Sequence, residues 1–341
     1  LVAWLDSLAG MGTGPVAVQR TAASPERLLG VLASARRIRL YAGLVGVALT
    51  AAIAFGSSEP DAAWIVLAAF YPVTHVLELS ATVFRNKIAW DVPVKMRAIA
   101  STLSLANVGV LVTLDVQRPA LFLVAVALGS TVANVLLHRA AQAHLPRVVG
   151  TVVPESGVFR EALPLGLAAL CSQTYFYVDN VFIRALRPEG ELGHYNVAVR
   201  AMSWTIMLAQ YTSLSVLPWL KRRQVAGDLG PALSKLAAPL FALSGLACGL
   251  VWPWTHELLE LFRPGFGAAS ASLKWLLCAT VAIYAGSMLL TALTALGKNV
   301  AMLWIAVLAV ALNIGANFWA VPKFGIEGAG MTTFATEAFV A

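Results

Sequence analysis

Long apolar blocks, each close to the length that crosses a lipid bilayer, constrain this chain more than any other feature. A spanning helix needs about 20 mostly apolar residues. Eleven such segments follow one another: 1–18, 40–56, 62–84, 98–114, 119–138, 161–183, 193–218, 236–252, 268–296, 300–321 and 326–341. Their apolar residues show none of the period-two alternation of a membrane β-barrel. The pattern predicts an all-α integral membrane protein.

Composition supports this prediction. Of the 341 residues, 59% are hydrophobic and 12% are charged, whereas a soluble domain has about 25% charged residues to keep its surface wet. This composition argues strongly against a soluble fold. Leu1 lies within an apolar run and Ala341 ends a short one, so we expect a fragment that lacks a first helix and the end of its last.

The basic residues predict how the chain is oriented. If the connection 19–39 is cytoplasmic, most of the 24 Lys and Arg residues fall on the cytoplasmic side of the predicted spans. This is the positive-inside distribution of membrane proteins, and it accounts for the net charge of +7. Because the basic residues are spread over separate connections without a nucleic-acid-binding motif, no nucleic-acid partner is predicted.

Signatures of catalysis are missing from the sequence. The three cysteines, Cys171, Cys248 and Cys278, are far apart and show no metal-ligand spacing. There is no phosphate-binding GxxxxGK[ST] motif, no HExxH and no GxSxG. We therefore predict no enzyme activity, no cofactor and no metal. A membrane-embedded glycan polymerase or ligase is the alternative from another class, but its catalytic outer loop would have to fit within about 253–267.

Two stretches carry a family resemblance. Residues 162–201 read ALPLGLAALCSQTYFYVDNVFIRALRPEGELGHYNVAVRA, and TALTALGKN (291–299) leads to NIGANFWAVPKFGIEGAGMTTFATE at 313–337. Both resemble the second half of bacterial polysaccharide and O-antigen flippases, which belong to the multidrug/oligosaccharidyl-lipid/polysaccharide exporter superfamily. Over 1–150 only topology and loop character are similar.

The resemblance implies a two-lobed, MATE-like helical bundle, here about eleven helices of a 12–14-helix protein. The lobes would be residues 1–150 and 151–341. It also implies a flippase that moves a lipid-linked oligosaccharide, a polyprenyl-pyrophosphate glycan, across the bacterial cytoplasmic (inner) membrane. The lipid bilayer, a polysaccharide polymerase and glycosyltransferases of the same pathway would be its partners. A multidrug/cation antiporter of the same superfamily is the alternative.

Charged residues inside apolar segments mark candidate sites, because each costs about 2.5–3.5 kcal/mol at the bilayer centre. Asp179 and Arg200 lie near the outer ends of consecutive segments and are close enough to pair across the hairpin. They form either a structural ion pair or a cavity site in which Asp179 positions Arg200. In the second case the Arg200 guanidinium would bind the phosphates, since its fork matches their oxygens.

Softer candidates surround this hairpin. Sugar contacts are predicted for Gln173, Tyr175, Tyr177, Tyr195 and Asn196, although tyrosines near helix ends also serve as interfacial anchors. Asp6 and Glu78 are candidates for ion coupling. Asn313 and Asn317 are four residues apart and so share a helix face, which favours hydrogen bonds between helices.

Overall fold

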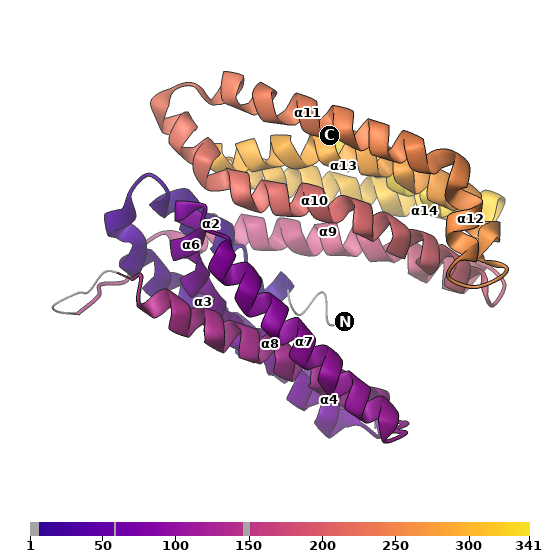
Figure 1. The fold of residues 1–341 in the computed structure, drawn as a ribbon, viewed down its shortest axis with the longest axis horizontal. Helices are drawn as coiled ribbons and strands as arrows, with labels where there is room; N and C mark the ends of the chain where they lie inside the picture. The colour runs from indigo at the N-terminus through magenta and orange to yellow at the C-terminus, as the bar shows by residue number, and fades with distance from the viewer. Residues whose placement is uncertain (1–6, 58, 146–150) are drawn as a thin grey trace. The chain divides into compact units, whose positions relative to one another are not determined.

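The chain folds as a set of helices divided between two compact units. The computed structural model describes residues 7–57, 59–145 and 151–341, and the regular structure in these ranges is helical throughout (Figure 1). Contacts divide the chain into Leu1–Leu167 and Ala168–Ala341. The division falls inside one helix, α9 (Val158–Leu186). The predicted all-α architecture is confirmed.

The first unit contains three long helices and a series of short ones. The long helices are α3 (Leu28–Gly56), α7 (Asp91–Thr113) and α8 (Pro119–Gln142). The short ones are α2 (Thr13–Thr21), η1 (Pro25–Arg27), α4 (Ala62–Ala68), η2 (Tyr71–Thr74), α5 (His75–Glu78), η3 (Leu79–Ala81) and α6 (Thr82–Lys87). Pro72 begins the break after α4, because its ring removes a backbone donor and prevents a continuous helix. The run 62–84 is therefore segmented.

Close backbone packing and ion pairs hold α2 against the start of α9. Gly12, which precedes α2, has φ 63°, and a Cβ placed there would lie 2.6 Å from the carbonyl oxygen of Ala162. Arg20 donates to both carboxylate oxygens of Glu161, at 2.8 and 2.7 Å. Arg20 also pairs with Glu155, 3.2 Å away. Only glycine fits at position 12, where the chain before α2 crosses the start of α9. The ion pairs of Arg20 hold the two helices in this alignment.

The second unit is a bundle in which one helix packs centrally. After α9 come α10 (Glu191–Ala226), α11 (Leu229–Val251), η4 (Trp252–Trp254), α12 (Thr255–Glu260), η5 (Phe266–Ala269), α13 (Ser270–Leu296) and α14 (Asn299–Val340). Helix α13 contacts α10, α11 and α14. Its side chains Leu273, Leu276 and Leu277 are buried together with Met202 of α10. This spacing of three and four residues places one face of α13 in the core.

Helix α14 bends where a glycine leaves the helical conformation. Gly325 has φ 60° and ψ −138°, a region that residues other than glycine rarely occupy. The Arg187–Glu191 ion pair (2.9 Å) packs beside this bend. The hydrogen bonds that Arg187 donates to the Glu191 carboxylate raise the pKa of the Arg187 guanidinium. The bend separates the two segments predicted at 300–321 and 326–341.

Seven helical stretches of the described residues are long and apolar enough to cross a membrane: Pro25–Gly56, Ala62–Lys87, Asp91–Thr113, Pro119–Gln142, Leu229–Glu260, Phe266–Leu296 and Asn299–Val340. Large apolar side chains point outward from them, such as Leu105 at 72% exposed. Lipid, and not water, suits such a surface. The chain is a multi-pass membrane protein.

Two predictions about local structure are wrong, and a third holds with an interruption. The segment 1–18 is not one helix, because the chain turns at Met11 and Gly12. The connection 19–39 is largely helical, because α3 begins at Leu28. The basic residues 36, 37 and 39 belong to this helix and not to a loop before it. The segment 62–84 falls within one stretch long enough to cross a membrane, Ala62–Lys87, but the helix is interrupted as described above. In each case hydropathy identified the apolar block, but glycine, proline or a charged helix end decided the boundary.

Candidate functional site

A pocket of about 520 Å³ opens in the second unit between α9, α10, α13 and α14. Helical spacing explains its walls. From α10 come residues 200, 203, 204, 206, 207 and 210, and from α13 come 283, 286, 287 and 290. Steps of three and four residues place each set on one helix face. The polar and aromatic lining consists of Ser172, Gln173, Tyr175, Phe176, Tyr177, Arg200, Ser203, Trp204, Gln210, Ser287 and Glu337.

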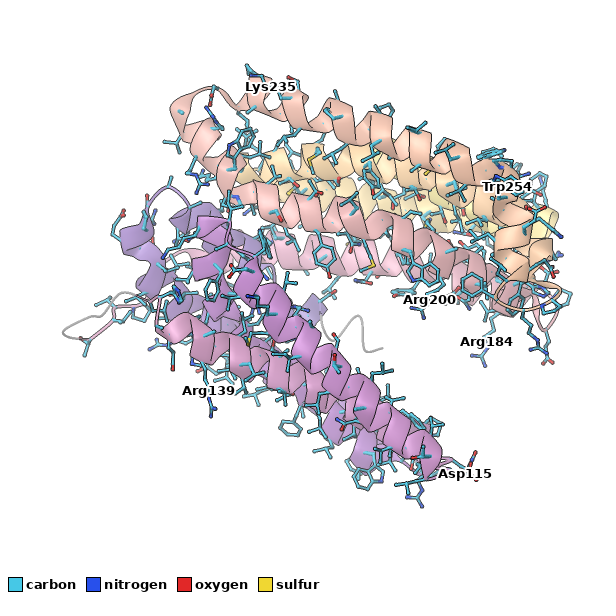
Figure 2. The ribbon with its side chains drawn as sticks, in the orientation of Figure 1. Asp115, Arg139, Arg184, Arg200, Lys235 and Trp254 are labelled. Atoms are coloured by element: carbon cyan, nitrogen blue, oxygen red, sulfur yellow. The ribbon has the colours of Figure 1, made fainter. Side chains whose placement is uncertain are left out.

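Arg200 carries the positive charge of this pocket. It lies on α10 and its side chain is exposed (Figure 2). It takes part in none of the ion pairs formed within the described ranges of the chain. A guanidinium that lines a pocket without a carboxylate partner can bind an anionic ligand group there.

Glu337 supplies a negative charge to the same pocket. It comes from the second part of α14 and is only 6% exposed. The Tyr175 side chain interacts with its carboxylate and lines the same pocket. The pocket therefore presents a cation on α10 and an acid on α14, with aromatic rings, hydroxyls and amides between them.

Asp179 lies outside the pocket lining, in a buried polar network. Its side chain is 2% exposed. Tyr195 Oη and Thr333 Oγ1 donate to Oδ2 at 2.7 and 2.8 Å. Asn317 Nδ2 donates to Oδ1 at 2.6 Å. Asn313 in turn donates to Thr336 at 3.1 Å. The hydrogen bonds predicted between helices for Asn313 and Asn317 are confirmed, and the carboxylate joins α9, α10 and both parts of α14.

The predicted pair between Asp179 and Arg200 is absent from the ion pairs of the described chain. Tyr195, not Arg200, faces Asp179. Five residues separate Tyr195 from Arg200 on α10, so their side chains point about 140° apart around the helix axis. Proximity across the hairpin in the sequence therefore does not predict this pairing. Arg200 lines the pocket, whereas Asp179 lies in the buried network.

The remaining candidates divide as follows. Gln173, Tyr175 and Tyr177 line the pocket with Arg200. Tyr195 is buried beside Asp179, and Asn196 is exposed and is not part of the pocket lining. Asp6 lies outside the described residues.

Glu78, in the first unit, is surrounded by positive charge. Its Oε1 receives Arg85 and Arg97, each at 3.1 Å, and its Oε2 receives Arg39 at 3.2 Å. A coupling cation would be repelled by three guanidinium groups at this distance. The ion-coupling prediction for Glu78 has no support in this geometry.

Several lining residues were not selected from the sequence. Ser203, Trp204 and Gln210 share the face of Arg200, so extending from Arg200 in steps of three and four would have found them. Ser172 is found in the same way from Tyr175. Within the described part of the chain no three His, Cys, Asp or Glu side chains cluster as metal ligands would.

The helical units, the membrane-crossing surfaces and the polar pocket define a polytopic membrane protein. Solved structures identify the fold: it is that of MATE transporters. An outward-facing multidrug resistance MATE family transporter of the MOP superfamily has a TM-score of 0.80 at 14% identity, with 99% of this chain and 82% of that chain covered. A MATE structure in the bent conformation gives 0.78 at 15%, with 99% and 81% covered.

A MATE transporter of Vibrio cholerae gives a TM-score of 0.75 at 16% identity, with 99% of this chain and 83% of that chain covered. No protein-family model matches the chain, and no curated protein matches it. The structural similarity establishes the fold. Because the sequence identities are low, the substrate has to be argued from the pocket.

Proposed function

We propose that this protein transports a lipid-linked oligosaccharide, a polyprenyl-pyrophosphate glycan, across the membrane, and that the pocket of the second unit binds its headgroup. The observation that carries the proposal is the Arg200 guanidinium, which lines the pocket without an acidic partner among the described residues. A substrate with phosphate groups supplies the missing anion.

The chemistry of the other walls suits a glycan. Gln173, Ser172 and Ser203 offer hydrogen-bond donors and acceptors for sugar hydroxyls. Tyr177 and Trp204 offer aromatic faces to the same space. The cavity of about 520 Å³ lies within the roughly 300–1,000 Å³ of typical ligand pockets. The pocket would hold the headgroup region, while the remaining sugars extend beyond it.

The chain itself supplies no ATP chemistry to this process. It has no phosphate-binding loop motif, so the proposed cycle alternates between inward-open and outward-open states around the bound headgroup. The proposed location is the bacterial cytoplasmic membrane, where glycosyltransferases build such a substrate and a polysaccharide polymerase consumes it.

Flipping by the purified protein tests the proposal. Proteoliposomes containing a fluorescent lipid-linked oligosaccharide report how fast the headgroup becomes accessible on the other side. A hydrogen bond to a charged group contributes about 1.5–3 kcal/mol, so Arg200→Ala should slow transport by about tenfold or more. Arg200→Lys keeps the positive charge but loses the two-pronged guanidinium geometry. Its transport rate should lie between those of wild type and Arg200→Ala.

Arg184→Ala is the matched control. Arg184 is also an exposed arginine of this unit, on α9, but it does not line the pocket (Figure 2). Wild-type rates for Arg184→Ala, with a collapse for Arg200→Ala at equal folded yield, support the proposal. Equal rates for Arg200→Ala and wild type would contradict it.

A multidrug/cation antiporter is the second candidate, and Glu337 is the observation that favours it. A buried acid in a pocket lined with aromatic rings would suit an organic cation. Uptake of a fluorescent cation against a proton gradient distinguishes the two. If wild type exchanges the cation, Glu337→Gln abolishes the exchange and the lipid is not moved, the antiporter is the better account.

A further inference from the structure

A group of basic side chains lies at the turn between α6 and α7 in the first unit. Arg85 and Lys87 end α6, and Lys95 and Arg97 lie in the first two turns of α7. Asp91 is the only acid between them. The positive-inside distribution predicts that this turn faces the cytoplasm. Basic residues at such a position attract the anionic lipids of the cytoplasmic leaflet.

Two of these arginines share one acceptor atom. Arg85 Nη2 and Arg97 Nη2 both donate to Glu78 Oε1, at 3.1 Å each. Each guanidinium carries five N–H donors, and Arg85 Nε is buried without an acceptor. The Arg97 side chain is 60% exposed. The pair therefore has more donors and more positive charge than one carboxylate satisfies, and Arg97 is open to a ligand.

A small polar groove adjoins Arg97. It has a volume of about 70 Å³ and runs between α7, α8 and η2. Besides Arg97, its polar lining comprises Tyr71, Ser101, Ser104, Ser130 and Asn134. Arg97, Ser101 and Ser104 repeat at four and three residues, so they share one face of α7. Hydroxyls beside a guanidinium are suited to the oxygens of a phosphate group.

The surface next to the groove is apolar. Along α7 the side chains of Ile99 and Leu105 are 53% and 72% exposed, and little of this helix is buried within the protein. A ligand at Arg97 would thus have a charged group at the helix start and a hydrocarbon surface beyond it. This combination matches a phospholipid better than a free ion, because a free ion makes no use of the apolar surface.

We propose that Arg97, with the hydroxyls of Ser101 and Ser104, binds the phosphate headgroup of an anionic phospholipid of the cytoplasmic leaflet, and that Arg85 adds positive charge behind the groove. A headgroup with net negative charge is favoured over a zwitterionic one, because the surplus guanidinium charge needs an anion and a choline would bring its own cation. The site lies in the first unit and does not depend on what the pocket of the second unit transports.

Binding of short-chain lipids to the purified full chain in neutral detergent tests the site. Phosphatidylglycerol should bind more tightly than phosphatidylcholine to wild type. Arg97→Gln should weaken phosphatidylglycerol binding by about tenfold or more, the effect of losing a direct hydrogen bond between charged groups. Arg97 is exposed, so this variant should fold. Ser101→Ala, also at an exposed position, should weaken binding to a smaller extent.

Lys95→Gln is the control variant. Lys95 is exposed on the same helix, two residues from Arg97 and so about 200° around its axis. Lys95→Gln removes the same charge at a position outside the groove. It should therefore change phosphatidylglycerol binding by less than about twofold. Equal losses in Lys95→Gln and Arg97→Gln would overturn the proposal in favour of diffuse attraction. The absence of a preference for phosphatidylglycerol over phosphatidylcholine would overturn it as well.

Inorganic phosphate separates the two possible sources of the anion. If it fails to displace phosphatidylglycerol at millimolar concentration, the lipid assignment is supported. If it displaces the lipid and binds wild type but not Arg97→Gln, the groove binds free anions and the lipid assignment is overturned.

Discussion

The hydrogen bond from Tyr195 to Asp179 should stabilise the second unit more than an ordinary bond between membrane helices. Tyr195 is 1% exposed and Asp179 is 2% exposed, so water cannot replace a lost hydroxyl. All three contacts of the carboxylate are with donors, as an ionised acid requires. A hydrogen bond to a charged group contributes about 1.5–3 kcal/mol, whereas bonds between membrane helices average about 0.6 kcal/mol.

Tyr195→Phe should therefore lower the free energy of unfolding by about 2 kcal/mol. Tyr284→Phe is a matched control, because the Tyr284 hydroxyl donates to a neutral acceptor, the Thr205 carbonyl, at 2.8 Å, and is 6% exposed. Tyr284→Phe should lower the free energy of unfolding by only about 0.6–1 kcal/mol. Reversible unfolding in bicelles, followed by a tag-binding trap, measures both.

A double-mutant cycle isolates the pairwise energy. With Asp179→Asn as the second change, the coupling between positions 179 and 195 should exceed about 1.5 kcal/mol. A coupling near 0.6 kcal/mol or below, or equal losses in Tyr195→Phe and Tyr284→Phe, would refute the reasoning, because the acceptor would then behave as a neutral group.

Two glycines should resist substitution for backbone reasons. Gly12→Ala adds a Cβ 2.6 Å from a backbone carbonyl at a φ of 63°, so folded yield in detergent should fall sharply, while Gly10→Ala, with open space around it, should not change it. Gly325→Ala forces a side chain into a glycine-only conformation beside Arg187 and should cost about 1–3 kcal/mol in unfolding free energy. Its control is Gly315→Ala, which meets nothing within 4 Å; equal losses at 315 and 325 would contradict the role of the bend.

The spans could be predicted from the sequence because the bilayer imposes a length and a hydropathy on each helix. The position of the bend in α14 matches a break in the apolar pattern, because Pro322 and Gly325 lie between the two predicted segments. Boundaries near charged residues were harder. Helix α3 continues through its basic start at Leu28–Arg39, because helix propensity and packing continue past the point where hydropathy falls.

The site could be predicted only where local periodicity decides it. Tyr175, Tyr177 and Arg200 line the pocket, as their spacing on two consecutive helices allowed. The partners of Asp179 could not be found that way. Asn317 and Thr333 lie 138 and 154 residues along the chain from Asp179, and only tertiary packing brings them together. The predicted Asp179–Arg200 pair is wrong because the sequence does not say which face of α10 turns toward α9, and Tyr195 occupies that face.

The buried network around Asp179 also bears on how the pocket meets its ligand. The network joins α9 and α10 to both parts of α14, and Tyr284 of α13 bonds to α10 through the Thr205 carbonyl. All four walls of the pocket are thus cross-linked beneath its lining. A cavity built this way changes shape little when it fills, so a ligand loses less affinity to ordering the protein. The selectivity of the proposed binding site would then depend on the fixed placement of Arg200 and Glu337.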